Sequence, residues 1–345
     1  MDRPALTVKR FAAADRDRWD AFVRACPQAS FFHLSAWQQV IEQTFRHRTH
    51  FLYAERAGDI VAVLPLAEIR SRLFGHALIS LPFCAYGGIA GEAAAAAPLE
   101  AEAEAIARVL GVAHLEYRNR ELRHADWPRQ DLYVTFRKPI LPDVEANLLA
   151  IPRKQRAMVR KGIGNGLLAT VDANAERFFA LYADNVRRHG TPALPKCHFE
   201  RLLELFGEQC EILTVTDAAG RPLSSVLSFY FRDEVLPYYA GDVACARELA
   251  ANDFKYWELM RRACERGCRM FDYGRSKVGT GPWSFKKNWG FEPQPLAYEF
   301  RLYKRDSVPQ NNPMNPRYRG LIALWRRLPL PVANLIGPHI VRNLG

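Results

Sequence analysis

The chain has 345 residues, 49% of them hydrophobic and 25% charged, so it has enough apolar material for globular domains and is unlike a disordered polymer. Lys and Arg outnumber Asp and Glu by 48 to 37, and the formal net charge of +11 favours anionic partners such as nucleotides, RNA or acidic lipid headgroups. The seven cysteines form no C-x-x-C pair, which argues against a disulfide framework or a zinc site. No apolar run resembles a signal peptide or a membrane span. We therefore expect a cytoplasmic protein.

Taken in chain order, the first half contains two amphipathic helices, a hairpin, a strand, a helix and a closing strand. These elements are predicted over residues 15–26, 35–45, 51–69, 76–82, 98–111 and 113–119. The second half repeats this order over residues 175–190, 198–209, 211–231, 235–241, 253–267 and 269–274. The order predicts an α/β fold with a mixed sheet and helices on both faces, and its repetition predicts two tandem copies.

The join between the copies is expected in the proline-containing stretch 139–152. We therefore predict an N-terminal domain over 1–138, a C-terminal domain over 139–303 and a separate tail over 304–345.

A basic helix is predicted directly after the join, in the sequence IPRKQRAMVRKGIGNGL. Its cations are Arg153, Lys154, Arg156, Arg160 and Lys161. Helical spacing places three of the arginines along one face, which a diphosphate could bridge, whereas a solvated helix face is the alternative.

Standard catalytic signatures are absent from the sequence. There is no G-x-S-x-G elbow, no H-E-x-x-H pair and no phosphate-binding P-loop. The remaining chemistry depends on positioning and electrostatics, such as direct attack of an amine on an activated acyl group. The candidates for a general base are Asp242 and His189, although Asp242 could be a turn residue and His189 a cation at a helix end.

The segment FDYGRSKVGTGPWSFKKNWGF, residues 271–291, combines cations, glycines and aromatic residues. Arg275, Lys277, Lys286 and Lys287 could meet phosphate or carboxylate groups, and the glycines would let the backbone approach a ligand. The alternative is a strand followed by an ordinary charged turn.

The tail begins with a stretch rich in proline and asparagine and continues as a basic apolar sequence. From residue 307 to 345 it contains no acidic residue. This composition suits an anionic membrane surface, and docking onto the body of the protein is the competing interpretation. Pro329, Pro331 and Pro338 exclude one long helix.

The basic helix, the sequence NDFKYWELMRRACERGCRMFDYGRS and the Phe285–Lys286 pair resemble the Fem family of peptidoglycan-bridge aminoacyltransferases. The resemblance is closest to the FemAB-related proteins of exopolysaccharide and PEP-CTERM/exosortase systems and covers residues 5–303. It implies two tandem GNAT-like domains, a phosphate-bearing substrate facing Arg156, Arg160 and Lys161, and a cation at the acyl-transfer site in Lys286.

The function implied is transfer of an acyl or aminoacyl group to an amine of a cell-envelope or exopolysaccharide precursor. We expect no tightly bound cofactor and no metal, with acyl-CoA or aminoacyl-tRNA as co-substrate. The helical arm that some Fem members insert for tRNA is not visible, and the stretch GDVACARELAAND lacks the Gly-x-Gly run of a coenzyme A loop, so the donor stays open. The alternatives are a non-catalytic envelope-assembly factor and an RNA-binding protein. Contact with the inner membrane through residues 320–345 is a further expectation.

Overall fold

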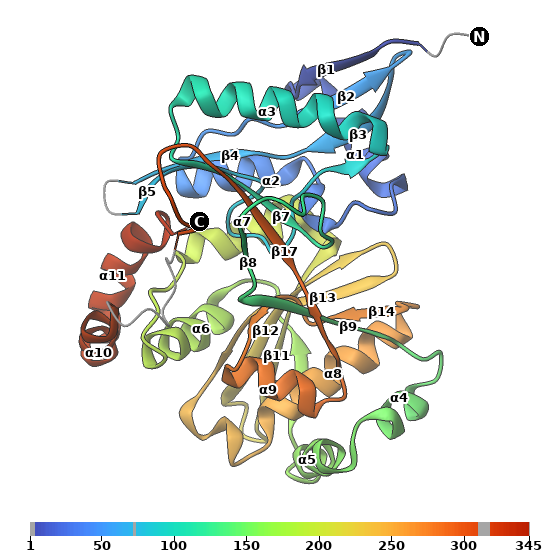
Figure 1. Ribbon diagram of the computed structural model, residues 1–345. Helices are drawn as coiled ribbons and strands as arrows, with labels where there is room; N and C mark the ends of the chain where they lie inside the picture. Colours follow the sequence, from blue (N-terminus) through green and yellow to red (C-terminus); the bar gives the residue numbers. More distant parts are fainter. Residues whose placement is uncertain (1–3, 72–73, 310–317, 345) are drawn as a thin grey trace. The chain divides into compact units, whose positions relative to one another are not determined.

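The computed structural model describes residues 4–71, 74–309 and 318–344. The chain forms two compact units (Figure 1). Unit 1 comprises Met1–Tyr133, Pro295–Asn311 and Asn343–Gly345, and unit 2 comprises Val134–Gln294 and Asn312–Arg342. Each unit is therefore built from segments that are far apart in the sequence.

Unit 1 holds two mixed or antiparallel sheets and the helices that cover them. Its strands are β1 (Leu6–Arg10), β2 (Leu52–Arg56), β3 (Asp59–Leu64), β4 (Ala67–Ser71), β5 (Gly75–Ile79), β6 (Ala90–Gly91), β7 (His114–Asn119), β8 (Arg129–Gln130) and β17 (Ala297–Leu302). Its helices are α1 (Arg16–Ala25), α2 (Ala36–Gln39), which continues as a π-helical segment over Val40–Phe45, and α3 (Ala96–Leu110). The strand orders are β1-β2-β3-β6 and β4-β5-β7-β17-β8.

The core of unit 1 lies beneath α3. Leu99 and Ile106 of this helix are buried together with Leu52, Leu64 and Leu115 of the strands. The apolar positions of α3 recur at helical spacing, which gives it one face for the sheet.

Unit 2 holds one long sheet. Its strands are β9 (Tyr133–Pro139), β10 (Leu168–Val171), β11 (Cys210–Thr216), β12 (Pro222–Phe231), β13 (Glu234–Asp242), β14 (Met270–Asp272), β15 (Ser276–Lys277) and β16 (Pro293–Pro295). The order is β10-β11-β12-β13-β14-β9-β15, with β16 beside β9. The helices are α4 (Val144–Ala150), α5 (Arg153–Gly164), α6 (Glu176–Arg188), α7 (Lys196–Phe206), α8 (Ala251–Glu265), α9 (Gly281–Asn288), α10 (Arg319–Arg327) and α11 (Leu330–Val341).

The same succession of strand pairings occurs in both units. In unit 1, β4 pairs antiparallel with β5, β5 pairs parallel with β7, and β7 pairs antiparallel with β17. In unit 2, β12 pairs antiparallel with β13, β13 pairs parallel with β14, and β14 pairs antiparallel with β9. The predicted α/β fold, with two copies of one element order, is confirmed.

The closing strand of each unit comes from the other half of the chain. Strand β9 follows the first set of elements in sequence but lies in the sheet of unit 2, whereas β17 follows the second set and lies beside β7 in unit 1 (Figure 1). Buried carboxylates hold both strands. Glu299 of β17 accepts hydrogen bonds from the backbone N–H of Arg123 at 3.1 Å and of His124 at 2.5 Å. Arg137 of β9 forms an ion pair with Asp272, with 3.2 Å between Nε and Oδ2.

This exchange places residues 295–303, which we expected in a C-terminal domain over 139–303, in the first sheet. The chain enters unit 2 at Tyr133–Val134, close to the expected boundary of 138. Strand exchange left no mark in the local element pattern, because a strand has the same alternating sequence whichever sheet receives it.

Most predicted elements are present, and several others were not predicted. The first strand of each copy, β1 and β10, was missed, as was α4 within the proline-containing join. The segment 271–291, which we expected to be turn-rich, contains helix α9. Among the described residues, no helix is long and apolar enough to cross a membrane.

The tail forms two helices, as its prolines predict. Helix α10 ends at Arg327 with Leu328 as its cap, and helix α11 begins at Leu330 with Pro329 as its cap. Both helices contact α6 of unit 2. The tail therefore docks onto the body of the protein, which was one of its two interpretations.

Candidate active site

Strands β13 and β14 run parallel for only two residue pairs within the described chain. Glu234 pairs with Met270 and Val235 with Phe271, after which β13 continues to Asp242 along β12. The chain beyond β14 turns away into the segment 273–291. The cations of that segment therefore come directly after the point in the chain where strands β13 and β14 of unit 2 diverge.

Lys286 lies in α9 and is 9% exposed. Its Nζ donates to the carbonyl oxygens of Tyr273 at 2.6 Å, Gly274 at 3.1 Å and Arg275 at 3.4 Å. The ammonium also lies 5.5 Å from the centre of the Phe136 ring. One lysine thus binds three successive carbonyl groups at the start of the diverging segment.

The electrostatic surroundings make Lys286 unusually easy to deprotonate. Its pKa is lowered to about 7, chiefly by burial; the Asp272 charge opposes the shift and the Arg275 charge adds to it. Burial also lowers the pKa of Lys277, to about 8, with Arg275 as the second cause. A primary amine that is close to half-neutral at pH 7 can take up a proton during a reaction.

Aromatic rings surround the three-carbonyl site, and several polar atoms within it lack a partner among the described residues. The buried atoms are Tyr273 Oη, Ser276 Oγ and Trp283 Nε1. Tyr273 and Ser276 are 3% and 6% exposed. Unsatisfied buried hydroxyl and indole groups are costly, so their concentration within residues 273–283 marks a place where a polar ligand would be stabilised.

Asp242 lies at the end of β13 and has a buried cation as its partner. Lys255 of α8 donates from Nζ to Asp242 Oδ1 at 2.8 Å, and its own side chain is 0% exposed. Ser224 also donates to Asp242 Oδ1, and Arg188 donates to the Asp242 carbonyl. Asp242 is therefore a strand residue in an ion pair, not a turn residue, and sequence analysis did not anticipate Lys255.

His189 caps the C-terminus of α6 and is exposed. Its carbonyl accepts from Arg326 at 3.4 Å, and no described contact joins its imidazole to Asp242 or Lys286. The histidine that is buried near β13 is His198, whose Nε2 lies 3.2 Å from Tyr239 Oη. Burial lowers the pKa of His198 to about 3, so it is neutral at physiological pH.

The basic residues of α5 lie on the surface of the same unit. Gln155, Val159 and Gly162 form the buried face of the helix against α8, and the predicted phosphate-binding residues lie outside this face: Arg153, Lys154, Arg156, Arg160 and Lys161. Arg156 is half-buried and donates to the carbonyl of Leu149 at 2.6 Å, so it also holds the end of α4.

A buried hydrogen-bond network joins α5 to α9. Asp253 Oδ1 accepts from Gln155 Nε2 at 2.8 Å and from Trp289 Nε1 at 3.0 Å. Burial raises the pKa of Asp253, and the two donors oppose that shift. The basic helix and the C-terminal end of α9 are thus held by one buried carboxylate.

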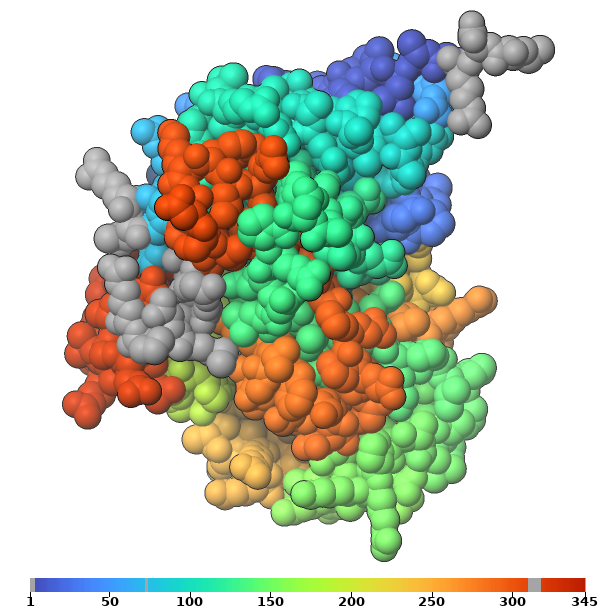
Figure 2. Space-filling view, in the orientation of Figure 1, coloured from blue at the N-terminus to red at the C-terminus, as the bar shows by residue number. Residues whose placement is uncertain are grey.

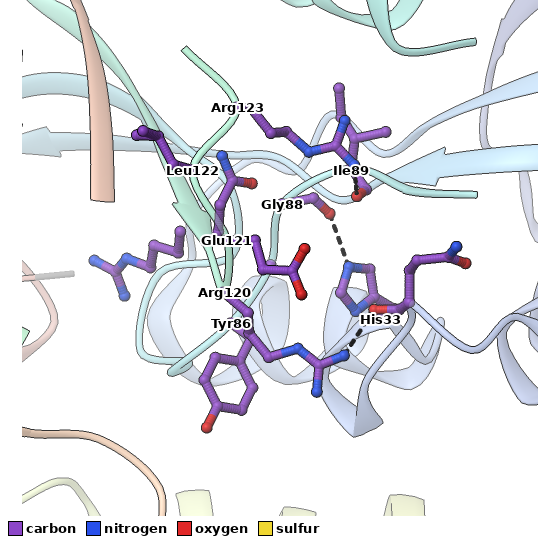
Figure 3. Close-up of a pocket in the computed structure, with 12 residues that line it drawn as sticks. His33, Tyr86, Gly88, Ile89, Arg120, Glu121, Leu122 and Arg123 are labelled. Carbon is purple, nitrogen blue, oxygen red and sulfur yellow. Dashed lines mark hydrogen bonds between the residues drawn. The ribbon is translucent and has the colours of Figure 1, made fainter. Parts of the chain in front are cut away.

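Unit 1 has a cavity of 190 Å³ that sequence analysis missed (Figure 3). Arg120 stacks on Tyr86 with 5.6 Å between the guanidinium carbon and the ring centre, and Arg123 donates to the carbonyl of Ile89 at 2.9 Å. His33 Nε2 bonds the Gly88 carbonyl at 2.8 Å from the opposite wall. The lining comes from Gln28 and His33, from residues 86–89 and from residues 118–123, three parts of the chain that only the fold brings together.

The loop before this cavity has a strained backbone. Leu81 and Phe83 have φ of +61° and +68°, which is costly for residues with a side chain. A Cβ on Gly87 would lie 2.3 Å from the backbone carbonyl oxygen of Ser80, so only glycine fits there. The dipeptide Gly87–Gly88 and the arginine-rich residues 118–123 were the available sequence signals.

In the described part of the chain, no group of three or more His, Cys, Asp or Glu residues could hold a metal ion. The cysteines that the structure describes are all unbridged.

Residues 150–287 match the family model described as an acetyltransferase (GNAT) domain. A search of curated protein sequences finds no match. This segment contains β13, β14, α8 and Lys286, so the match covers the diverging strands and the three-carbonyl lysine.

Several solved structures share the fold over most of the chain. FemX has a TM-score of 0.68 at 14% identity, covering 92% of this chain and 100% of that chain. The C-terminal domain of a putative lysylphosphatidylglycerol synthetase from Agrobacterium fabrum has a TM-score of 0.57 at 14% identity, covering 84% and 92%. A tandem GNAT protein from the clavulanic acid biosynthesis pathway has a TM-score of 0.54 at 13% identity, covering 88% and 100%.

At these identities the neighbours establish the fold, and together with the domain match they support an N-acyltransferase or aminoacyltransferase. The resemblance to the Fem family is confirmed in the architecture. The chain has the tandem GNAT-like fold that FemX also has, and residues 150–287 of its second copy match the model of a GNAT acetyltransferase domain.

Proposed function

We propose that the protein transfers an acyl or aminoacyl group to an amine of a phosphate-bearing precursor of the cell envelope or of an exopolysaccharide. The observation that carries this proposal is Lys286, a buried lysine with a pKa of about 7 beside the point where β13 and β14 diverge within a GNAT domain. The structural likeness to FemX and to a lysylphosphatidylglycerol synthetase domain supports a substrate of the envelope.

In the proposed reaction, the acceptor amine attacks the carbonyl carbon of the donor. A C–N bond forms, and the C–S bond of a thioester or the C–O bond of an aminoacyl ester breaks. Neutral Lys286 has two N–H donors, which suffice for the carbonyls of Tyr273 and Gly274, and a lone pair in place of its longest contact, at 3.4 Å to the Arg275 carbonyl. This lone pair takes the proton that the amine loses and returns it to the departing thiolate or alkoxide, so no metal or redox partner is required.

The diverging strands supply the place for the donor acyl group. Beyond Val235 the edge of β13 that faces away from β12 is not used by β14, so its backbone groups can bind the donor as an added strand would. Tyr273 Oη and Ser276 Oγ, which have no partner in the described chain, are available to the acceptor or to the carbonyl oxygen that becomes negative.

The phosphates of the precursor would bind to the surface cations of α5 and to Arg275 and Lys277. The three-carbonyl site and the α5 surface belong to one unit and are joined through Asp253, which supports their action on one substrate. We propose a cytoplasmic location at the inner membrane, where lipid-linked precursors are made.

The test is a search for turnover with both donor classes. The full-length protein is incubated with acetyl-CoA or with a mixture of aminoacyl-tRNAs, together with UDP-linked amino sugars and lipid-linked precursors, and mass spectrometry follows the acyl mass on the acceptor. Product formation with wild type but not with Lys286→Met is expected.

Binding of a precursor without turnover by any donor would favour the alternative, an assembly factor that keeps the GNAT fold for binding. Product formation by Lys286→Met at the wild-type rate would remove Lys286 from the proposed reaction.

A further inference from the structure

The tail docks on unit 2 with only one face of each helix. Ile322 of α10 covers Gly190, where a Cβ would lie 2.5 Å from the isoleucine methyl group, and Gly337 of α11 lies against Ala193, where a Cβ would lie 3.2 Å from the backbone. Ala333 is 2% exposed. Arg187 of α6 donates to the carbonyl of Arg326 at 2.9 Å, which anchors the end of α10.

The other face of each helix exposes large apolar side chains. The exposed fractions are 64% for Leu321, 60% for Leu324, 39% for Val332, 72% for Leu335 and 41% for Ile336. We call these five side chains the outer apolar face. They recur at spacings of three and four within each helix, as a continuous stripe requires. The red segment of Figure 2 is the tail, and its side chains reach the surface of the molecule.

The charge of the tail has one sign. Residues 318–344 contain Arg319, Arg326, Arg327 and Arg342 and no acidic residue. Arg319 and Arg327 are exposed, and neither has an ion-pair or hydrogen-bond partner in the described structure. An exposed apolar stripe bordered by unpaired arginines is unfavourable in water but favourable where acyl chains and anionic headgroups meet.

We propose that α10 and α11 bind the surface of an anionic lipid bilayer, with the outer apolar face in the acyl boundary and the arginines among the headgroups. The docked inner face fixes the two helices to unit 2, so the membrane contact would orient the domain that carries Lys286. A second copy of the chain is a poorer partner, because the arginines of the two copies would repel each other.

Deleting the tail is a poor test, because it would uncover the apolar surface of α6. The sharper variants change only the outer face. Leu324→Ser with Leu335→Ser removes apolar area, and Arg319→Gln with Arg327→Gln removes charge. The matched control is Leu168→Ser on β10, whose leucine is 57% exposed in the same unit.

Binding is measured by sedimentation of the full-length protein with vesicles of phosphatidylcholine, with or without phosphatidylglycerol. Wild type and Leu168→Ser should sediment with the anionic vesicles and less with neutral ones. The leucine pair should weaken partitioning by at least ~10-fold, and each arginine removed by about 5-fold. High salt should weaken binding of wild type, and thermal unfolding should show that all variants are folded.

Equal sedimentation of wild type and the leucine pair would overturn the proposal, as would an equal loss in the Leu168→Ser control. Size-exclusion chromatography is the second readout. A dimer of wild type that the leucine pair converts to a monomer would show that the outer apolar face is covered by another copy, and would also overturn it. Because binding is measured without turnover, failure here leaves the proposed reaction unaffected.

Discussion

Lys255 donates from Nζ to Asp242 Oδ1 at 2.8 Å while its side chain is completely buried. Asp242→Asn would leave this buried ammonium without its counter-charge, and breaking one half of a buried pair costs about 3–5 kcal/mol. We therefore expect Asp242→Asn to lower the free energy of unfolding by that amount in a urea titration. Asp242→Asn combined with Lys255→Met should recover part of the loss, because no charge is then left unpaired.

The same variant tests whether Asp242 serves to neutralise Lys255 or acts as the general base of the reaction. Were Asp242 the general base, its amide variant would lose turnover without losing stability. Unchanged unfolding of Asp242→Asn would therefore contradict the structural assignment of the pair.

Lys286 should control the pH dependence of turnover. Its pKa of about 7 means that the neutral amine, the form able to accept a proton, dominates above pH 7, so kcat should rise with pH and level off above that value. Lys286→Arg stays protonated throughout this range and should lose about 10²–10⁴-fold in kcat. Lys287→Met is the matched control, because Lys287 is an exposed neighbour on the same helix. A wild-type profile that is flat between pH 6 and 8, as a roughly chosen window around that pKa, would contradict the base role.

Burial of Lys286 also predicts a pH dependence of stability. Its pKa falls from the usual 10.5 to about 7 on folding, so between these values the unfolded chain binds more protons than the folded chain. The contribution of Lys286 to the free energy of unfolding should therefore rise with pH in this window, by up to about 1.4 kcal/mol per pH unit, and be flat below it. Urea titrations of wild type and Lys286→Met across this window measure the difference. Parallel curves for the two proteins would mean that Lys286 has an ordinary pKa.

The surface cations of α5 should bind phosphate without stabilising the fold. Arg153→Gln, Arg160→Gln and Lys161→Gln should each weaken binding of UDP, because a charge-assisted contact contributes about 1.5–3 kcal/mol. Thermal unfolding should stay unchanged, since these side chains are exposed. Arg156 is left intact because it holds the Leu149 carbonyl. The control is Arg269→Gln, an exposed arginine of unit 2, and equal UDP affinity in all four variants would exclude this surface.

Local patterns in the sequence predicted much of the fold. The hairpin turn at residues 57–59 is present, with Ala57 and Gly58 at φ of +52° and +93°, because short turns of this kind need the left-handed region. The strands β1 and β10 were missed since both are short edge strands of five and four residues and neither has a buried residue, so their sequences carry a weak apolar signal. Helix α9 was missed because its glycine and proline indicate turns, whereas here Pro282 occupies the first turn of a helix.

The candidate site could be predicted only in part. Lys286 was identified from a resemblance, but its three carbonyl partners and its burial depend on how 273–275 turns back over α9. Lys255 was not singled out by any sequence pattern, and only the fold places it beside Asp242. Side-chain partners that lie far apart in sequence leave no periodic signal, so these relations needed the structure.

The exchange of β9 and β17 has a consequence for biosynthesis. Unit 1 lacks a strand until residue 302 has left the ribosome, although most of its residues are made by position 133. The incomplete sheet leaves the edge of β7 unpaired during that interval, and an unpaired edge invites association with other chains. A nascent chain of this protein is therefore most vulnerable to misassembly midway through translation, and neither half of the gene would encode a complete domain.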